Sequence, residues 1–240
     1  MNASNAHRSA GAGASIAALC ALAAAAAMAG DIASRATPYE HMARLEQYLM
    51  DPSAEIALAR SAAPAAISAQ AAVLVLKTQG YDSAVTGTNG FTCVVERSWM
   101  LPFDSPEYWN PKFRAPVCYN PAASRSVLTY TFKRTGLALA RDSRERILDE
   151  IRAAIARNEL PLPEPGAMSY MMSRDGYLGD DQGHWHSHLM FHVPKATPAT
   201  WGANLPGSPV VLDERPMPEP QTIFLVPVSH WSDGTEAPAL

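Results

Sequence analysis

Residues 184–193 read His-Trp-His-Ser-His-Leu-Met-Phe-His-Val, and this stretch is the most informative pattern in the chain. Apart from Ser187, the odd positions are apolar, including Trp185 and Leu189. The even positions carry four of the seven histidines: His184, His186, His188 and His192. Since successive side chains of a strand point to opposite faces, the alternation predicts a strand with imidazoles on one face and packed apolar side chains on the other. We therefore expect this strand to be part of a β-sheet.

Three of these imidazoles, at positions i, i+2 and i+4, predict a site for a divalent transition metal. Neutral imidazole is a common ligand of zinc, copper and iron, so the first-choice ligands are His184, His186 and His188. Neighbours on one face of a strand lie about 7 Å apart, and three can share one ion only where the strand bends or bulges. His192 lies about 13 Å beyond His188 on the same rise and is a less favourable ligand. The alternative is a polar strand face whose histidines bind water or carbonyl groups.

Other side chains are candidates to complete or support this metal site. Asp180 and Asp181 come just before the histidines and could serve as a ligand, a general base or an acceptor that orients an imidazole. Acids in an ordinary loop would have the same appearance. His230 follows the apolar stretch 223–226, which we expect to pair with the histidine strand, so His230 is the best remote ligand candidate.

The N-terminus predicts export. Arg8 is followed by an uncharged, alanine-rich stretch that ends in Ala27-Met28-Ala29, the small-x-small pattern of a signal-peptide cleavage site. The low hydrophobicity of the stretch argues against a membrane anchor, which needs about 20 strongly apolar residues. We expect residues 1–29 to be a signal peptide and the mature chain, from Gly30, to be periplasmic or secreted without a stable membrane anchor.

The composition of the chain restricts its partners and its domain number. The 240 residues carry a formal net charge of −4, and the sequence has no basic cluster. These features argue against nucleic acid or an anionic membrane as a partner. Residues 30–240 are enough for one sizeable core and long for two small domains, so we expect a single domain.

The expected mature chain keeps two cysteines, Cys93 and Cys118. In an oxidising compartment an even pair is more often a disulfide than a redox or metal motif. We therefore expect the two to be bonded, closing the proline-rich stretch between them. Two buried thiols are the alternative.

Strand and helix signals along the chain predict an α+β fold, a mainly antiparallel sheet with N-terminal helices and one long helix between strands. Asn89-Gly90 indicates a hairpin, and five prolines predict irregular structure over 100–124. Glu96 and Arg97 are consecutive residues at the end of one expected strand, so their side chains point to opposite faces. For each of them the expected role is a structural salt bridge. Helices are expected at 38–49, 52–61 and 142–158, the last with Asp142 and Glu145 as a capping box; strands are expected at 73–76, 84–86, 91–98, 127–132, 168–172, 184–193 and 223–226.

Four segments together resemble a family of uncharacterised exported bacterial proteins. They are Asn89-Gly90-Phe91 through Trp99, Phe103-Asp104-Ser105-Pro106, Gly183-His184-Trp185-His186 and Trp201-Gly202-Ala203-Asn204-Leu205-Pro206-Gly207. The resemblance would cover most of the mature chain and implies export and a bacterial source. The family has no established activity, so the resemblance implies no mechanism.

Three functions fit these observations. The protein could bind a transition metal without turnover, use the same site as a metalloenzyme, or be a structural or interaction protein of the cell envelope with no metal. The chain lacks a glycine-rich phosphate loop, a Gly-x-Ser-x-Gly elbow and a His-Glu-x-x-His motif. We expect metal binding, while the sequence identifies neither a substrate nor a catalytic residue.

Overall fold

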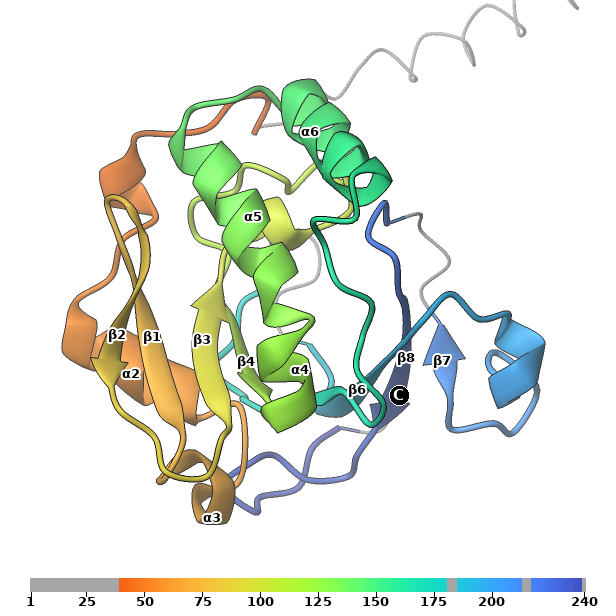
Figure 1. Ribbon diagram of the computed structural model, residues 1–240. Helices are drawn as coiled ribbons and strands as arrows, with labels where there is room; N and C mark the ends of the chain where they lie inside the picture. The colour runs from red at the N-terminus through yellow and green to blue at the C-terminus, as the bar shows by residue number, and fades with distance from the viewer. Residues whose placement is uncertain (1–38, 181–184, 213–216, 239–240) are drawn as a thin grey trace, which may run out of the picture. The chain divides into compact units, whose positions relative to one another are not determined.

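Eight strands form one sheet in the described part of the chain, in the spatial order β2-β1-β3-β4-β5-β6-β8-β7 (Figure 1). All neighbouring strands are antiparallel except β1 and β3, which are parallel. The strands are β1 (Ala72–Lys77), β2 (Gly80–Val85), β3 (Thr92–Glu96), β4 (Ala115–Tyr119), β5 (Met168–Met171), β6 (His188–Val193), β7 (Val211–Leu212) and β8 (Thr222–Pro227). With the helices below, this mostly antiparallel sheet makes the fold α+β, as the sequence predicted.

The computed structural model describes residues 39–180, 185–212 and 217–238, which belong to one compact unit. The predicted signal peptide, residues 1–29, lies outside the described residues. Within the described ranges, every helix falls short of the length and hydrophobicity that crossing a membrane requires.

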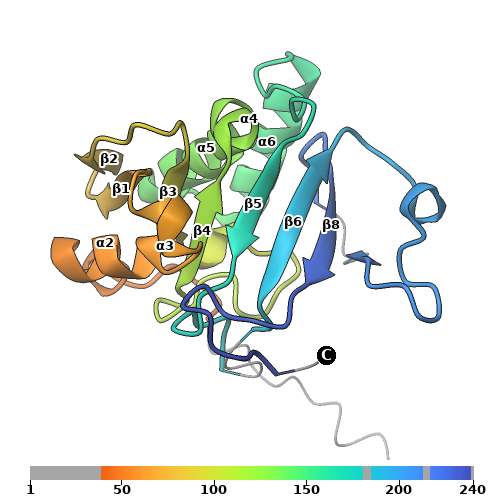
Figure 2. The same cartoon turned by 90° about the horizontal axis from the view of Figure 1, so that it is seen from below.

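Helices cover both faces of the sheet. Figure 2 shows α2 and α3 on one face, and α4, α5 and α6 on the other. The helices are α2 (Pro52–Arg60), α3 (Ala65–Ser68), α4 (Pro121–Arg125), α5 (Leu128–Leu139) and α6 (Arg144–Ala156), with short 3-10 turns η1 (Leu45–Gln47), η2 (Ser98–Met100) and η3 (Pro198–Trp201). The sheet thus separates two apolar layers.

Strand alternation assigns side chains to these two layers. On β3, Val94 faces the layer under α5 and α6, whereas Cys93 and Val95 face the layer under α2. Phe91 packs in the second layer with Cys93 and Val95. Both layers contain fully buried side chains, so β3 is a central strand of the core.

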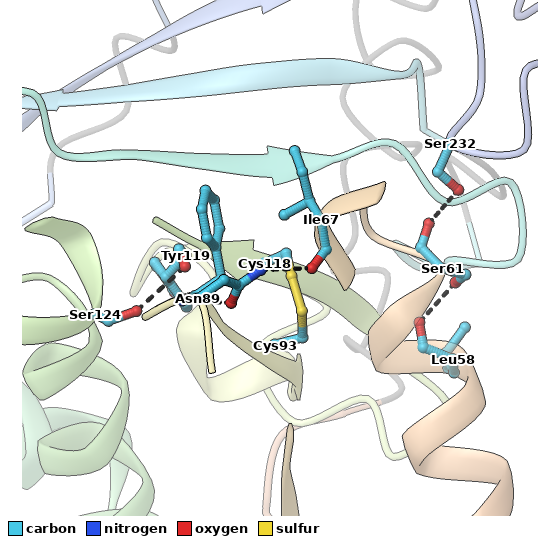
Figure 3. Close-up of a disulfide and its surroundings, with 10 residues drawn as sticks. Leu58, Ser61, Ile67, Asn89, Cys93, Cys118, Tyr119, Ser124 and Ser232 are labelled. Atoms are coloured by element: carbon cyan, nitrogen blue, oxygen red, sulfur yellow. Dashed lines mark hydrogen bonds between the residues drawn. A yellow bond between two sulfur atoms is a disulfide. The ribbon is translucent and has the colours of Figure 1, made fainter. Parts of the chain in front are cut away.

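Cys93 and Cys118 form the predicted disulfide, which joins β3 to β4 (Figure 3). The two residues lie directly opposite each other in the strand register, and both are fully buried in the layer under α2. In Figure 3 the bond lies beside Asn89, whose side-chain amide donates to the carbonyl of Ile67 at 2.8 Å. The bridge therefore fixes the register of two central strands.

The stretch 127–132, expected as a strand, is helical and begins α5. Its β-branched and aromatic residues favour a strand locally, but the buried side chains Leu128, Thr131, Thr135 and Ala138 recur at helical spacing. Packing of this face against the sheet outweighs local propensity. As a result α4 and α5 precede the expected long helix, which is α6, so three helices and not one lie between β4 and β5.

Side-chain caps set the N-terminal ends of α2 and α6. Asp51 accepts from the backbone N–H groups of Ser53 and Ala54 at 2.9 and 3.1 Å and starts α2 where the sequence predicted a helix. For α6 the cap is Ser143, which accepts from the N–H of Arg146, and the predicted Asp142 cap was one residue too early. Of the helix expected at 38–49, the described residues 39–49 form η1, and the carbonyl of the buried Tyr48 accepts from Arg97 Nε.

The Asn89-Gly90 turn does not form the predicted hairpin. It leads into β3, which runs parallel to β1, and the hairpin instead joins β1 to β2 through Gly80, whose φ is 133°. Likewise, Pro116 lies in a central strand despite the expected loop. Pro116 pairs with Val95 of β3 on one side. On the other side, β5 pairs only with Cys118 and Tyr119 of β4, so it does not need the N–H that proline lacks.

We expect the double variant Cys93→Ala/Cys118→Ala to lose about 3 kcal/mol of unfolding free energy, because the bridge restricts the unfolded chain. Urea unfolding of a chain beginning at Gly30 measures this loss, and the wild-type protein under reducing agent is the matched control. A thiol assay on the denatured, unreduced protein should detect almost no free thiol, and two titratable thiols would contradict the bond.

Candidate functional site

A cavity of about 240 Å³ lies on the face of the sheet that carries α5. Its walls are mostly apolar and include Met100, Phe113, Met171, Trp185 and Met190. Its polar lining residues come from β3, β4, α5, β6 and the segment that leads into β8: Glu96, Tyr119, Tyr130, Thr131, His188, His192, Glu219 and Gln221. The cavity is the candidate functional site because apolar walls with a few convergent polar groups are typical of ligand pockets.

Glu96 is the central polar group of the cavity lining. It is 8% exposed, and its Oε1 accepts hydrogen bonds from the hydroxyls of Tyr119 at 2.5 Å and Thr131 at 2.7 Å. Burial raises the pKa of Glu96 above its usual range, and these two hydrogen bonds only partly oppose the shift. Burial thus shifts the equilibrium of Glu96 toward the neutral acid relative to a carboxyl in water.

Glu96 is a site residue that the sequence did not identify. Salt bridges were the default for Glu96 and Arg97, and only Arg97 makes one, a buried pair with Glu55 at 2.9 Å. Because β3 alternates, Glu96 shares the cavity face with Val94, and Arg97 points elsewhere. The sequence feature that could have identified Glu96 as a site residue is its carboxyl at the end of a largely apolar strand.

His192 is buried in the wall of the cavity and held at both ring nitrogens. Nδ1 donates to Gln221 Oε1 at 3.1 Å, so Nε2 of the neutral ring accepts from Ser169 Oγ at 2.9 Å. Burial lowers the pKa of His192 to about 4, with the Gln221 hydrogen bond opposing the shift. The ring is therefore neutral at pH 7 and serves as a fixed polar wall.

His188 also lines the cavity, with its ring 6.2 Å from the ring of Trp185 in an edge arrangement. Nδ1 of His188 lies 2.6 Å from the backbone carbonyl of His186. Donation to that carbonyl leaves Nε2 as the free nitrogen. Burial lowers the pKa of His188 as well.

Arg134 and Glu219 form a buried ion pair beside the cavity. The guanidinium contacts both carboxylate oxygens, with Nε at 2.6 Å and Nη2 at 2.9 Å, and Nη1 donates to the carbonyls of Trp99 and Leu101. Both side chains are almost completely buried. The charge of Glu219 is thus neutralised within the protein.

The structure describes part of the expected metal site. His184 and Asp181 lie outside the described residues. His186 is exposed, His188 and His192 line the cavity, and His230 is exposed after β8. Within 39–180, 185–212 and 217–238, no group of three or more His, Cys, Asp or Glu side chains could hold a metal ion.

Asp180, a further candidate for the metal site, is occupied by other partners. It accepts from the hydroxyls of Tyr177 and Tyr39 and pairs with Lys112 at 3.3 Å. Hydrogen bonds from Tyr177 and Tyr39 lower the pKa of Asp180 to about 2. These contacts give Asp180 a structural role that the sequence did not reveal.

Alternation in the histidine stretch holds only within β6. The strand begins at His188, and from there His188 and His192 face the cavity. Trp185 was expected on the face opposite the histidines, but it lines the cavity together with His188, because residues 185–187 are not in a strand. The predicted pairing with 223–226 is confirmed, since β6 pairs with β8 throughout.

Comparison with known protein families, with curated proteins and with solved structures found no match to this chain.

The low pKa of His192 predicts a loss of stability in acid. Below the pKa of the unfolded chain, about 6.5, the unfolded state binds a proton that the folded state excludes until about pH 4. The unfolding free energy should therefore fall between pH 6.5 and 4, by about 3 kcal/mol from this group. Urea unfolding of wild type and His192→Gln across this range measures the difference. Parallel curves for the two proteins would contradict the assignment.

Proposed function

We propose that the protein is an exported protein that binds a small organic ligand in the cavity beneath α5. The observation that carries this proposal is the cavity itself, about 240 Å³, with mostly apolar walls and a few convergent polar groups. Ligand pockets typically have this composition, because the apolar walls hold the body of a ligand and the polar groups orient it. A cavity of this size next to a sheet is therefore a candidate for a purpose other than folding.

The lining suits a ligand with an apolar body. The walls include four methionines, Met100, Met171, Met190 and Met217, whose flexible thioethers adapt to different shapes. Drug-sized ligands occupy pockets of about 300–1,000 Å³, so this cavity suits a smaller molecule. The polar groups, above all Glu96 and Thr131, would orient the ligand.

The proposal of export rests on the disulfide and on the N-terminal sequence. Disulfides persist in oxidising compartments and are rare in the cytosol of most organisms. The bond between Cys93 and Cys118 supports the location that residues 1–29 predict. The resemblance to exported bacterial proteins implies the same location.

We expect 1-hexanol, a small neutral probe, to bind the protein in the cavity that Trp185 and Met190 line, as measured by isothermal titration. Met190→Trp should abolish binding, because the larger ring fills the space that the ligand needs. Leu189→Met, on the opposite side of the same strand, is the matched control and should bind as wild type does. Unchanged binding in Met190→Trp would place the probe elsewhere and contradict the proposal.

A second candidate function is binding of a transition metal by His184, His186 and His188. The observation that favours it is the contact between His188 Nδ1 and the carbonyl of His186, which leaves Nε2 as the ligand nitrogen. In addition, Ser187 Oγ donates to the carbonyl of His230 at 2.6 Å, which brings His230 next to this segment.

Metal binding is tested by dialysis against zinc or copper followed by elemental analysis. We expect one ion per chain in wild type, with affinity lowered steeply in His186→Ala and His188→Ala, because few protein ligands hold the ion. His192→Ala is the control, since its ring is bonded to Ser169 and Gln221. Equal metal content in wild type and all three variants would eliminate the site.

A further inference from the structure

We infer that the cavity takes a small organic amine, whose ammonium group is bound by Glu96 and whose apolar body fills the rest of the space. This inference rests on the proposed function of the cavity and adds the chemical class of its ligand. It depends on the charges of the lining, on the free oxygen of Glu96 and on the aromatic walls.

The charges of the lining leave one carboxyl without a cationic partner. Glu96 and Glu219 are the two acidic residues of the described lining, and the lining contains no Lys or Arg. Arg134 contacts both oxygens of Glu219, so that charge is compensated. Glu96 makes no ion pair with any described residue and accepts only from the hydroxyls of Tyr119 and Thr131. A cation in the cavity would supply the missing partner.

The geometry of Glu96 also leaves an oxygen for the ligand. Both hydroxyls donate to Oε1, and among the described residues none donates to Oε2. Tyr119 on β4 and Thr131 on α5 hold the carboxyl from two elements, so Oε2 is presented in a fixed position. An ammonium group can donate to that oxygen, and hydrogen bonds to a charged group are stronger than those between neutral groups.

The aromatic walls favour a cation over an anion. Phe113, Tyr119, Tyr130 and Trp185 line the same cavity. The faces of aromatic rings attract cations through the ring quadrupole, most strongly where water is excluded. A carboxylate ligand would instead meet Glu96 and Glu219 without a free cation to bind it. The lining therefore discriminates by charge as well as by size.

Burial and a bound cation act on Glu96 in opposite directions. Burial raises the pKa of Glu96 above its usual range. Binding of an ammonium ion would favour the carboxylate, since an opposite charge nearby stabilises the charged form. An amine gains free energy of binding from that pairing, whereas an alcohol of the same shape does not.

The experiment compares hexylamine, 1-hexanol and hexanoate, which share one alkyl chain, by isothermal titration of the full chain. Wild type should bind hexylamine about tenfold or more tightly than 1-hexanol, as a charge-assisted hydrogen bond predicts, and hexanoate least. Glu96→Gln should remove the preference for the amine while keeping 1-hexanol binding. Glu46→Gln, which removes a carboxylate from an exposed side chain, is the control for net charge and should behave as wild type.

The outcomes separate this inference from the proposed function. Binding of 1-hexanol with no preference for hexylamine in wild type would overturn the amine inference and leave the cavity as a site for neutral ligands. An amine preference that survives Glu96→Gln would also overturn it. If none of the three probes binds wild type, both the inference and the proposed function fail. The comparison of probes on wild type decides the question even if the Glu96→Gln variant does not fold.

Discussion

The buried ion pair of Arg134 with Glu219 is the interaction on which the layer that contains the cavity depends. It joins α5 to the segment that leads into β8, and Arg134 also binds the carbonyls of Trp99 and Leu101. Two charges in a buried environment are tolerated only when each is paired and hydrogen-bonded, so these segments must keep their relative positions. The same pair neutralises Glu219, and Glu96 is left as the carboxyl of the cavity lining without a cation.

The sheet separates the layer under α2 from the layer under α5, which contains the cavity. In the layer under α2, Cys93 and Cys118 are bonded across β3 and β4. On the other side the same two strands carry Glu96 and Tyr119, which are hydrogen-bonded to each other. A covalent link on one face thus fixes the register of the strands that present polar groups on the opposite face. Stability and the candidate site are supported by the same pair of strands.

Several parts of the structure were predictable because their signals are local. The strand at 223–226, the start of α2 at Asp51 and the alternation on β3 follow from residues close in sequence. The disulfide followed from the number of cysteines and the predicted compartment. The errors arose where distant packing decides. Residues 127–132 are helical because their buried face meets the sheet. The strand that follows the Asn89-Gly90 turn pairs with β1 and not with its neighbour in sequence, β2.

By itself the sequence determined the α+β class, most strand positions and the disulfide, and it identified the histidine stretch as a region of interest. Only the tertiary structure decided which side chains share a site. Glu96, Tyr119, Thr131 and His192 come from four different elements, and no spacing in the sequence connects them. Their meeting point depends on the order of strands and on the helix that packs over them. These are set by burial of apolar surface across the whole chain, a property that no local pattern records.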